Sequence, residues 1–170
     1  MTRNSALSLV VSALSAMIFS AVAKPPPLIL WNASASAPIG LYASLPMDKL
    51  TVDALVVARP PEALAKFLVA RRYIGSDVVL IKRIAALDGQ RVCRSDGLIT
   101  VDGKALGFAQ ASDHLGRPLP AWQGCRTLAS NQVFLMTSSV PASLDGRYFG
   151  PLDRSTIIGR AVPLLTFEGR

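Results

Sequence analysis

Two serines separated by one residue are the first candidates for chemistry in this chain. Ser34 and Ser36 lie in the stretch WNASASAPIGLY, residues 31–42, where small side chains lead into Pro-x-Gly-x-Tyr. A serine hydroxyl becomes a good nucleophile when a neighbouring base takes its proton. The chain has a single histidine, His114, in a loop-like run with no motif around it. The stretch is therefore either a flexible linker or the place of a nucleophile whose base is not histidine.

A lysine in the middle of an apolar run is a candidate for that base. Residues 77–87 read DVVLIKRIAAL, and both faces of the predicted strand are apolar although Lys82 and Arg83 stand at its centre. In one interpretation the charged ends reach the edge of a sheet and only their stems pack. In the other, Lys82 is buried, and desolvation lowers its pKa from about 10.4. A neutral lysine amine can take a proton from a serine hydroxyl.

A third polar segment, SLDGRYFGP at residues 143–151, suits the same chemistry. If it is extended, Ser143, Asp145 and Arg147 point to one side. Ser143 could then hydrogen-bond a lysine amine and orient it, while Asp145 and Arg147 form an ion pair that holds the segment in place. Taken alone, the segment also has the composition of an ordinary polar turn.

Strands dominate the elements that must position these residues. Period-2 patterns and short apolar runs predict strands at residues 28–31, 51–58, 77–87, 91–94, 97–106, 131–139 and 155–165. Asp102-Gly103 predicts a hairpin turn. Residues 60–72 begin with proline and predict one short amphipathic helix. We therefore expect a mostly β, antiparallel domain with one short helix, and 170 residues are enough for one such domain.

The first part of the chain predicts a membrane segment. Residues 5–23 carry no charge over 19 positions and would form a helix of about 28 Å, close to the thickness of a bilayer core. Arg3 and the run Ala21-Val22-Ala23 also fit a signal peptide that is removed. We expect a cytoplasmic tip and transmembrane anchor at 1–24 and an exported domain at 25–170, with prolines 25–27 stiffening the connection.

Charge and cysteine usage narrow the class of protein further. The net charge of +7 fits a solvated basic surface or one near anionic lipid headgroups, and no nucleic-acid motif accompanies it. The spacing of Cys93 and Cys125 resembles no zinc motif, so we expect neither a metal nor a cofactor. In an exported domain the two cysteines would form a disulfide, and two buried thiols are the alternative.

In their order along the chain, the apolar segment and the three polar segments resemble the serine/lysine signal peptidases of bacterial inner membranes. IKRIAALDGQRV, residues 81–92, is similar to the lysine box of that family. SAPIGLY, residues 36–42, departs from the Ser-Met-x-Pro-Thr of the leader peptidases. It is closer to the Ser-x-Pro-x-Gly-x-Tyr of the conjugative-transfer branch, the TraF-type pilin-maturation peptidases. MTSSVPA, residues 136–142, replaces the Gly-Asp-Asn that precedes the last box in leader peptidases.

The resemblance implies a signal-peptidase-like β fold and a role for each polar residue. Ser36 would be the nucleophile and Lys82 the general base. The Ser34 hydroxyl would help the Ser36 amide to bind the oxyanion, since acyl transfer requires donors at that point. Pro38 and Gly40 would form the turn that sets Ser36 against the lysine strand. The supporting residues would be Ser143, Asp145, Arg147 and Arg83.

The function implied is that of a serine endopeptidase anchored by one segment in the inner membrane, in contact with its lipid, with the catalytic domain on the periplasmic side. Its substrate would be an exported protein, which in this branch is a pilin precursor, processed through an acyl-enzyme and released by water or as a cyclic product. The alternatives are a general type I signal peptidase and a non-catalytic assembly component of a conjugation or type IV secretion apparatus. No Ser-x-x-Lys occurs in the chain, which excludes a penicillin-binding-type hydrolase.

Overall fold

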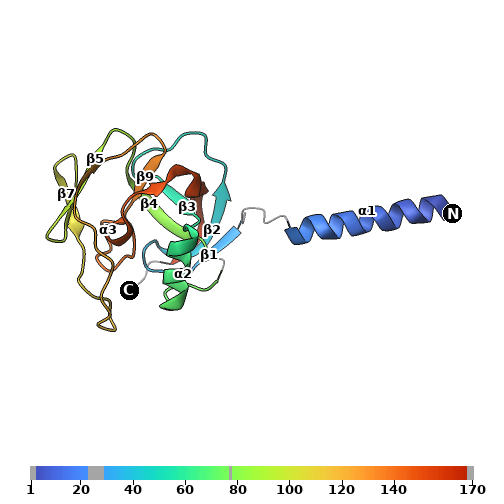
Figure 1. The fold of residues 1–170 in the computed structure, drawn as a ribbon, viewed down its shortest axis with the longest axis horizontal. Coiled ribbons are helices and arrows are strands. Elements are labelled where there is room, and N and C mark those ends of the chain that lie inside the picture. Colours follow the sequence, from blue (N-terminus) through green and yellow to red (C-terminus); the bar gives the residue numbers. More distant parts are fainter. Residues whose placement is uncertain (1–2, 23–28, 77, 168–170) are drawn as a thin grey trace.

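The computed structural model describes residues 3–22, 29–76 and 78–167. The predicted N-terminal helix is present as helix α1 (Arg3–Val22), which lies apart from the β domain in Figure 1. Within the described residues, no helix meets the length and hydropathy needed for a membrane crossing. The role of this segment as an anchor therefore stays a prediction.

The β domain consists of two antiparallel sheets. The larger has the strand order β1 (Ile29–Asn32), β2 (Ile39–Leu45), β11 (Ile157–Phe167), β3 (Leu55–Ala58), β4 (Leu80–Ala86), β9 (Gln132–Leu135) and β10 (Leu152–Asp153). The smaller has the order β7 (Lys104–Phe108), β6 (Leu98–Val101), β5 (Arg91–Ser95) and β8 (Gly124–Thr127). All pairs of neighbouring strands run antiparallel. The prediction of a mostly β, antiparallel domain is confirmed.

The helices of the domain are short. Helix α2 (Glu62–Ala70) starts directly after Pro61 and buries Leu68, as the amphipathic pattern predicts. Two further turns were not predicted: helix α3 (Gly146–Phe149) and a 3₁₀ turn at Arg154–Thr156. The expectation of a single short helix in the domain was therefore incomplete.

Gly40 has a different role from the one that the sequence predicted. It lies inside strand β2, where Tyr42 and Ser44 are also buried. A Cβ atom at Gly40 would stand 2.1 Å from the carbonyl oxygen of Leu165 on β11. Gly40 is thus required by the close approach of two strands, and the predicted turn of Pro38 and Gly40 is wrong. The chain turns earlier, at residues 34–37, where the Ala37 amide reaches the Ser34 carbonyl at 3.5 Å.

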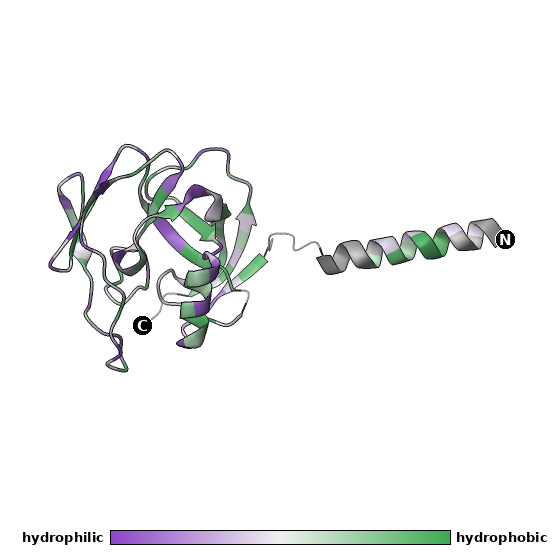
Figure 2. Ribbon diagram, in the orientation of Figure 1, coloured by the Kyte–Doolittle hydropathy of each residue, from purple (hydrophilic) through white to green (hydrophobic). Residues whose placement is uncertain are grey.

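Buried apolar clusters join the two sheets and anchor the serine turn. One cluster packs Ala86 and Phe134 of the large sheet against Val92 and Ile99 of the small sheet. A second contains Ala37 together with Ile81 and three further residues, Tyr42, Val57 and Ala161. In Figure 2 the strands at the centre of the domain are largely hydrophobic, with hydrophilic stretches among them. The residues next to Ser36 and Lys82 in sequence thus belong to one cluster.

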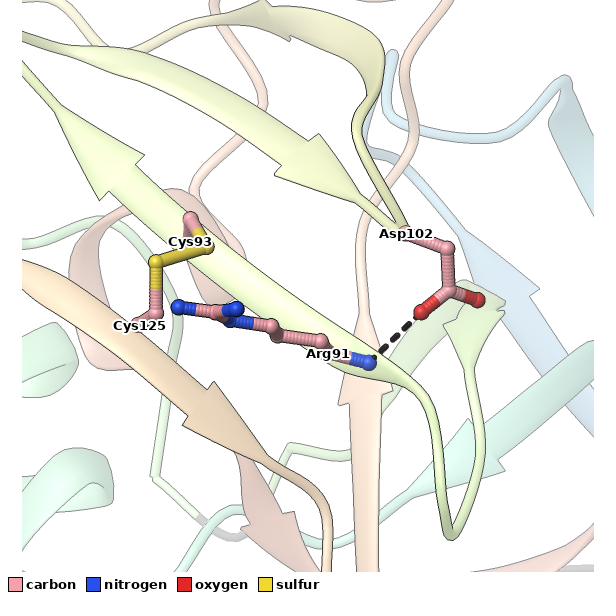
Figure 3. The surroundings of a disulfide bond; sticks show 4 residues. All are labelled: Arg91, Cys93, Asp102 and Cys125. Atoms are coloured by element: carbon pink, nitrogen blue, oxygen red, sulfur yellow. Dashed lines mark hydrogen bonds between the residues drawn. A yellow bond between two sulfur atoms is a disulfide. The ribbon is translucent and has the colours of Figure 1, made fainter.

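A disulfide between Cys93 and Cys125 joins β5 to β8, as predicted (Figure 3). The two cysteines are direct cross-strand partners, with Cα atoms 4.0 Å apart. All four residues of β8 are exposed, so this strand buries little apolar surface of its own. The covalent bond is therefore a main constraint that keeps β8 on the sheet.

Replacing both cysteines by serine should lower the free energy of unfolding by about 2–4 kcal/mol, because the bond restricts the unfolded chain between positions 32 residues apart. Urea unfolding followed by circular dichroism measures this change. Cys93→Ser alone should lose about as much as the double variant, since either change removes the bond. Rapid labelling of both thiols in the native wild-type protein would contradict the disulfide.

Candidate active site

The serine turn between β1 and β2 is held by a buried asparagine. The Asn32 side-chain amide donates to the carbonyls of Ser34, Ala37 and Pro38 at 2.9–3.0 Å. Its oxygen accepts the Ser34 amide at 3.2 Å. The Tyr42 hydroxyl donates to the Pro38 carbonyl at 2.7 Å. These bonds give the turn a fixed shape, which argues against the interpretation of a flexible linker.

Ser34 and Ser36 lie in direct contact within this turn. Their hydroxyl oxygens are 2.9 Å apart, and the Ser36 amide donates to the Ser34 hydroxyl at 3.3 Å. Ser36 is buried, with 6% of its surface exposed. The two groups predicted to bind an oxyanion are thus side by side, and without a substrate they bond to each other.

Lys82 is buried in strand β4, with 5% of its surface exposed. Its Nζ donates to the Ser143 hydroxyl at 2.9 Å, so the structure brings these two predicted residues together. Its neighbour Arg83 is exposed and donates to the Asp53 carbonyl at 2.8 Å. Of the two interpretations of the Lys-Arg pair, the one in which Lys82 is buried is correct. Arg83 takes no part in the contact between Lys82 and Ser143.

Burial lowers the pKa of Lys82 to about 8 because the ammonium loses its hydration. The Asp145 carboxylate acts in the opposite direction and raises this pKa, while the Arg147 guanidinium lowers it. The charges that act on Lys82 therefore come from the 145–147 segment rather than from Arg83. Near neutral pH a useful fraction of the amine is unprotonated, which a general base requires.

Asp145 and Arg147 form a buried ion pair with two contacts. Arg147 Nη2 and Nε lie 2.9 Å from the two carboxylate oxygens of Asp145. Their side chains are 1% exposed for Arg147 and 0% for Asp145. The pair is the one predicted, but the segment 143–147 does not continue as an extended strand. Asp145 caps α3 by accepting the Arg147 amide, and Arg147 lies within that helix.

The Arg147 guanidinium also shapes the loop that carries Ser143. It donates to the carbonyls of Thr137 at 2.8 Å, Val140 at 2.7 Å and Pro141 at 3.1 Å. Asp145 accepts the Thr137 amide at 3.1 Å, so both members of the ion pair bind this loop. The loop has no strand or helix to satisfy its backbone, and the ion pair supplies those partners. Ser143 is placed by this arrangement.

Three residues that sequence reasoning did not single out complete the site. Asn32 holds the serine turn, as described above. A Cβ atom at Gly146 would lie 2.5 Å from a ring carbon of Phe134 and 2.7 Å from the Leu135 carbonyl, so only glycine fits. Arg94 is buried and donates to the Arg147 carbonyl at 2.6 Å. Asn32 directly follows the predicted strand 28–31, and Arg94 lies in the predicted strand 91–94; a polar residue beside these apolar residues was the available indication.

His114 lies elsewhere. It lines a cavity of about 430 Å³ with Arg71, Arg72, Tyr73 and Arg117, and neither Ser36 nor Lys82 contributes to that lining. Among the described residues, no group of histidine, cysteine or acidic side chains is arranged to hold a metal. The Ser36 hydroxyl is bonded to Ser34 and the Lys82 amine to Ser143, so each member of the predicted dyad has a different partner. The two groups are a serine hydroxyl and a buried amine, the types that nucleophilic attack on a carbonyl requires.

Comparisons with known proteins find a family and several relatives that this chain resembles. The family model described as signal peptidase, peptidase S26, matches residues 1–165. The chain is similar to a plasmid transfer protein TraF of Escherichia coli, with 36% identity over 149 residues, 80% of this chain and 82% of that protein. It is 31% identical over 150 residues to the conjugal transfer protein TraF of Agrobacterium fabrum, covering 81% of this chain and 82% of that one.

Among solved structures, a signal peptidase I of Enterococcus faecalis matches with 16% identity and a TM-score of 0.40, covering 67% of this chain and 97% of that one.

The Lys82 amine should titrate near pH 8, because burial disfavours its charged form. The measurement is NMR of protein labelled with ¹³C at the lysine Cε, followed as a function of pH. The spectrum of Lys82→Arg assigns the resonance by its disappearance. A titration of Lys82 near pH 10.5, the ordinary lysine value, would show that the amine is hydrated and charged.

Proposed function

Because the chain belongs to the signal peptidase family, peptidase S26, we propose that it is a serine endopeptidase with Ser36 as nucleophile and Lys82 as general base. The observation that carries this proposal is the buried Lys82 amine, held at 2.9 Å by the Ser143 hydroxyl and with its pKa lowered to about 8. A lysine is almost never buried in this way unless it has a partner or a function.

In the proposed reaction, the neutral Lys82 amine takes the proton of the Ser36 hydroxyl as Ser36 Oγ attacks the substrate carbonyl. The tetrahedral intermediate collapses, the peptide C–N bond breaks, and the Lys82 ammonium returns the proton to the leaving amine. The resulting ester joins Ser36 to the acyl part of the substrate. Water, activated again by Lys82, then releases an acid, or an amine of the substrate releases an amide.

The oxyanion would be bound by the Ser36 amide and the Ser34 hydroxyl. Both groups can donate, and they are in contact with each other: the Ser36 amide donates to Ser34 Oγ at 3.3 Å, and Ser34 Oγ lies 2.9 Å from Ser36 Oγ. A carbonyl oxygen that enters the site would replace Ser34 Oγ as the acceptor of the Ser36 amide. Removing one such donor from an acyl-transfer enzyme costs about 10²–10³-fold in rate, so the proposed role of Ser34 is large.

We propose an exported pilin precursor as the substrate. The relatives are named for plasmid transfer and conjugal transfer, and the Ser-x-Pro-x-Gly-x-Tyr motif at residues 36–42 resembles the conjugative branch of the family. Release of the acyl-enzyme by the amino group of the pilin itself would give a cyclic product. A general signal peptidase would instead cut many exported proteins after small residues.

Ser36→Ala and Lys82→Met should each abolish processing of the pilin precursor while the protein stays folded, because the first removes the attacking oxygen and the second removes the base. Mass spectrometry of the pilin from cells that express each variant measures this outcome, including the loss of water that marks a cyclic product. His114→Ala is the matched control and should process normally. Full processing by either site variant would favour a non-catalytic assembly role.

We further propose that the N-terminal segment is retained as a single inner-membrane anchor, with the β domain on the periplasmic side. An enzyme held at the membrane meets an exported substrate at a raised effective concentration. The purified protein should therefore keep its N-terminal residues and stay with the membranes after carbonate extraction. Intact mass and N-terminal sequencing decide this, and a mature protein that starts at Lys24 would mean that the segment is a cleaved signal.

A further inference from the structure

We propose that Arg94 and Trp122 are positioning residues for the reaction proposed above. Arg94 lies in the small sheet and Trp122 in the segment that flanks it, and both bind the backbone of α3. Through α3 they keep Ser143 in contact with Lys82. This inference rests on the proposed function for its catalytic consequence. Its structural part, the coupling of Arg94 and Trp122 to Lys82, can be tested without any activity.

Arg94 is an unusual residue to find inside this domain. It lies on β5, is 6% exposed and donates to the Arg147 carbonyl at 2.6 Å, with a longer contact to the Pro120 carbonyl at 3.4 Å. Its Nε has no hydrogen-bond partner in the described part of the chain. Burying a guanidinium without a carboxylate partner is costly. What Arg94 gains in this buried position is its hydrogen bond to the Arg147 carbonyl.

Trp122 makes the second contact with α3. Its indole Nε1 donates to the Gly146 carbonyl at 3.0 Å. Its ring packs edge-on against Phe134 with centroids 6.4 Å apart, and Arg126 of β8 lies over it at 5.8 Å. The indole therefore connects the segment before β8, the core beneath α3 and the backbone of α3.

The two carbonyls that accept these bonds are consecutive. Helix α3 has only four residues, so the carbonyls of its last turn have few partners within the helix. The Gly146 carbonyl accepts the Gly150 amide, and Trp122 adds a second bond to it. The Arg147 carbonyl is the acceptor for Arg94. A helix of this length is not stable by itself, and these side chains fix it in place.

Any shift of α3 reaches Lys82 through contacts already described. The Arg147 side chain on α3 binds three carbonyls of the loop 137–141, and the same loop leads into Ser143. The Ser143 amide bonds back to the Val140 carbonyl at 3.1 Å, and its hydroxyl accepts Lys82. Arg94 stands next to Cys93, whose disulfide joins β5 to β8. The donors to α3 thus come from one covalently joined pair of strands and the segment that leads into it.

The test uses the full-length protein with the variants Arg94→Met and Trp122→Phe, each of which removes a donor and keeps an apolar side chain. In each variant the kcat for a pilin-derived peptide should fall by about 10- to 100-fold, with KM within about twofold. The reason is that the lost hydrogen bond, which is charge-assisted for Arg94 and comes from the indole for Trp122, affects the orientation of the base Lys82 and not the substrate. Arg94→Lys keeps one donor and should recover part of the rate. Arg91→Met, an exposed arginine on the same strand, is the matched control and should keep the wild-type rate.

A double-mutant cycle separates positioning of Lys82 from a general loss of stability. Ser143→Ala removes the contact through which Arg94 is proposed to act. In that background Arg94→Met should cost less than about threefold, since residues in one network are strongly non-additive. A full and additive loss in the double variant would overturn the proposed route through Ser143.

The Lys82 titration observed by ¹³C NMR provides the readout that does not depend on activity. In Arg94→Met and Trp122→Phe it should move to higher pH than in the wild type, because a displaced loop admits water to the ammonium. Arg91→Met should leave it unchanged. If the wild type lacks peptidase activity, the proposed function fails while this measurement still decides the coupling. A wild-type titration in folded Arg94→Met and Trp122→Phe would overturn the inference, and Trp122→Phe alone decides it if Arg94→Met fails to fold.

Discussion

The buried ion pair of Asp145 and Arg147 is the interaction on which the geometry of the site depends. Together its two side chains bind four backbone groups of residues 137–141, a stretch without regular structure. Each charge is buried only because the other is present, and removal of one partner from such a pair typically costs about 3–5 kcal/mol. The sequence places the pair two residues apart, but the bidentate geometry arises because Asp145 caps helix α3 and Arg147 lies in its first turn.

The same ion pair explains how Lys82 can be buried without being held in its charged form. A lone carboxylate beside the amine would stabilise the ammonium and raise its pKa. Here burial is the largest influence and lowers the pKa of Lys82 to about 8, while Arg147 opposes the effect of Asp145. Ser143 accepts a hydrogen bond from the amine at 2.9 Å and carries no charge. The amine is therefore oriented by a neutral group, and the two neighbouring charges act on its pKa in opposite directions.

The sequence predicted the strands that are marked by apolar residues and missed the elements that are not. Strand β4 was predicted because it lies in an apolar run, although Lys82 stands inside it. Strand β2 was missed because its buried positions are Gly40, Tyr42 and Ser44, so polar or small residues face inward. Strand β8 has no buried residue and hence no pattern. The helical turn after Asp145 depends on Gly146 fitting against Phe134, a contact between distant parts of the chain that local propensity cannot indicate.

The serine turn adds a last constraint on how the site works. The amide and hydroxyl of the buried Ser36 would each cost free energy without a partner, and both are bonded to the hydroxyl of the exposed Ser34. In the proposed reaction, a substrate carbonyl would replace Ser34 Oγ as the acceptor of the Ser36 amide, and the Ser34 hydroxyl would turn to donate to it. Asn32 would hold the backbone of the turn during this exchange, since its side-chain amide bonds to carbonyls and not to the hydroxyls. The proposed exchange would therefore require rotation of a hydroxyl rather than rearrangement of the backbone.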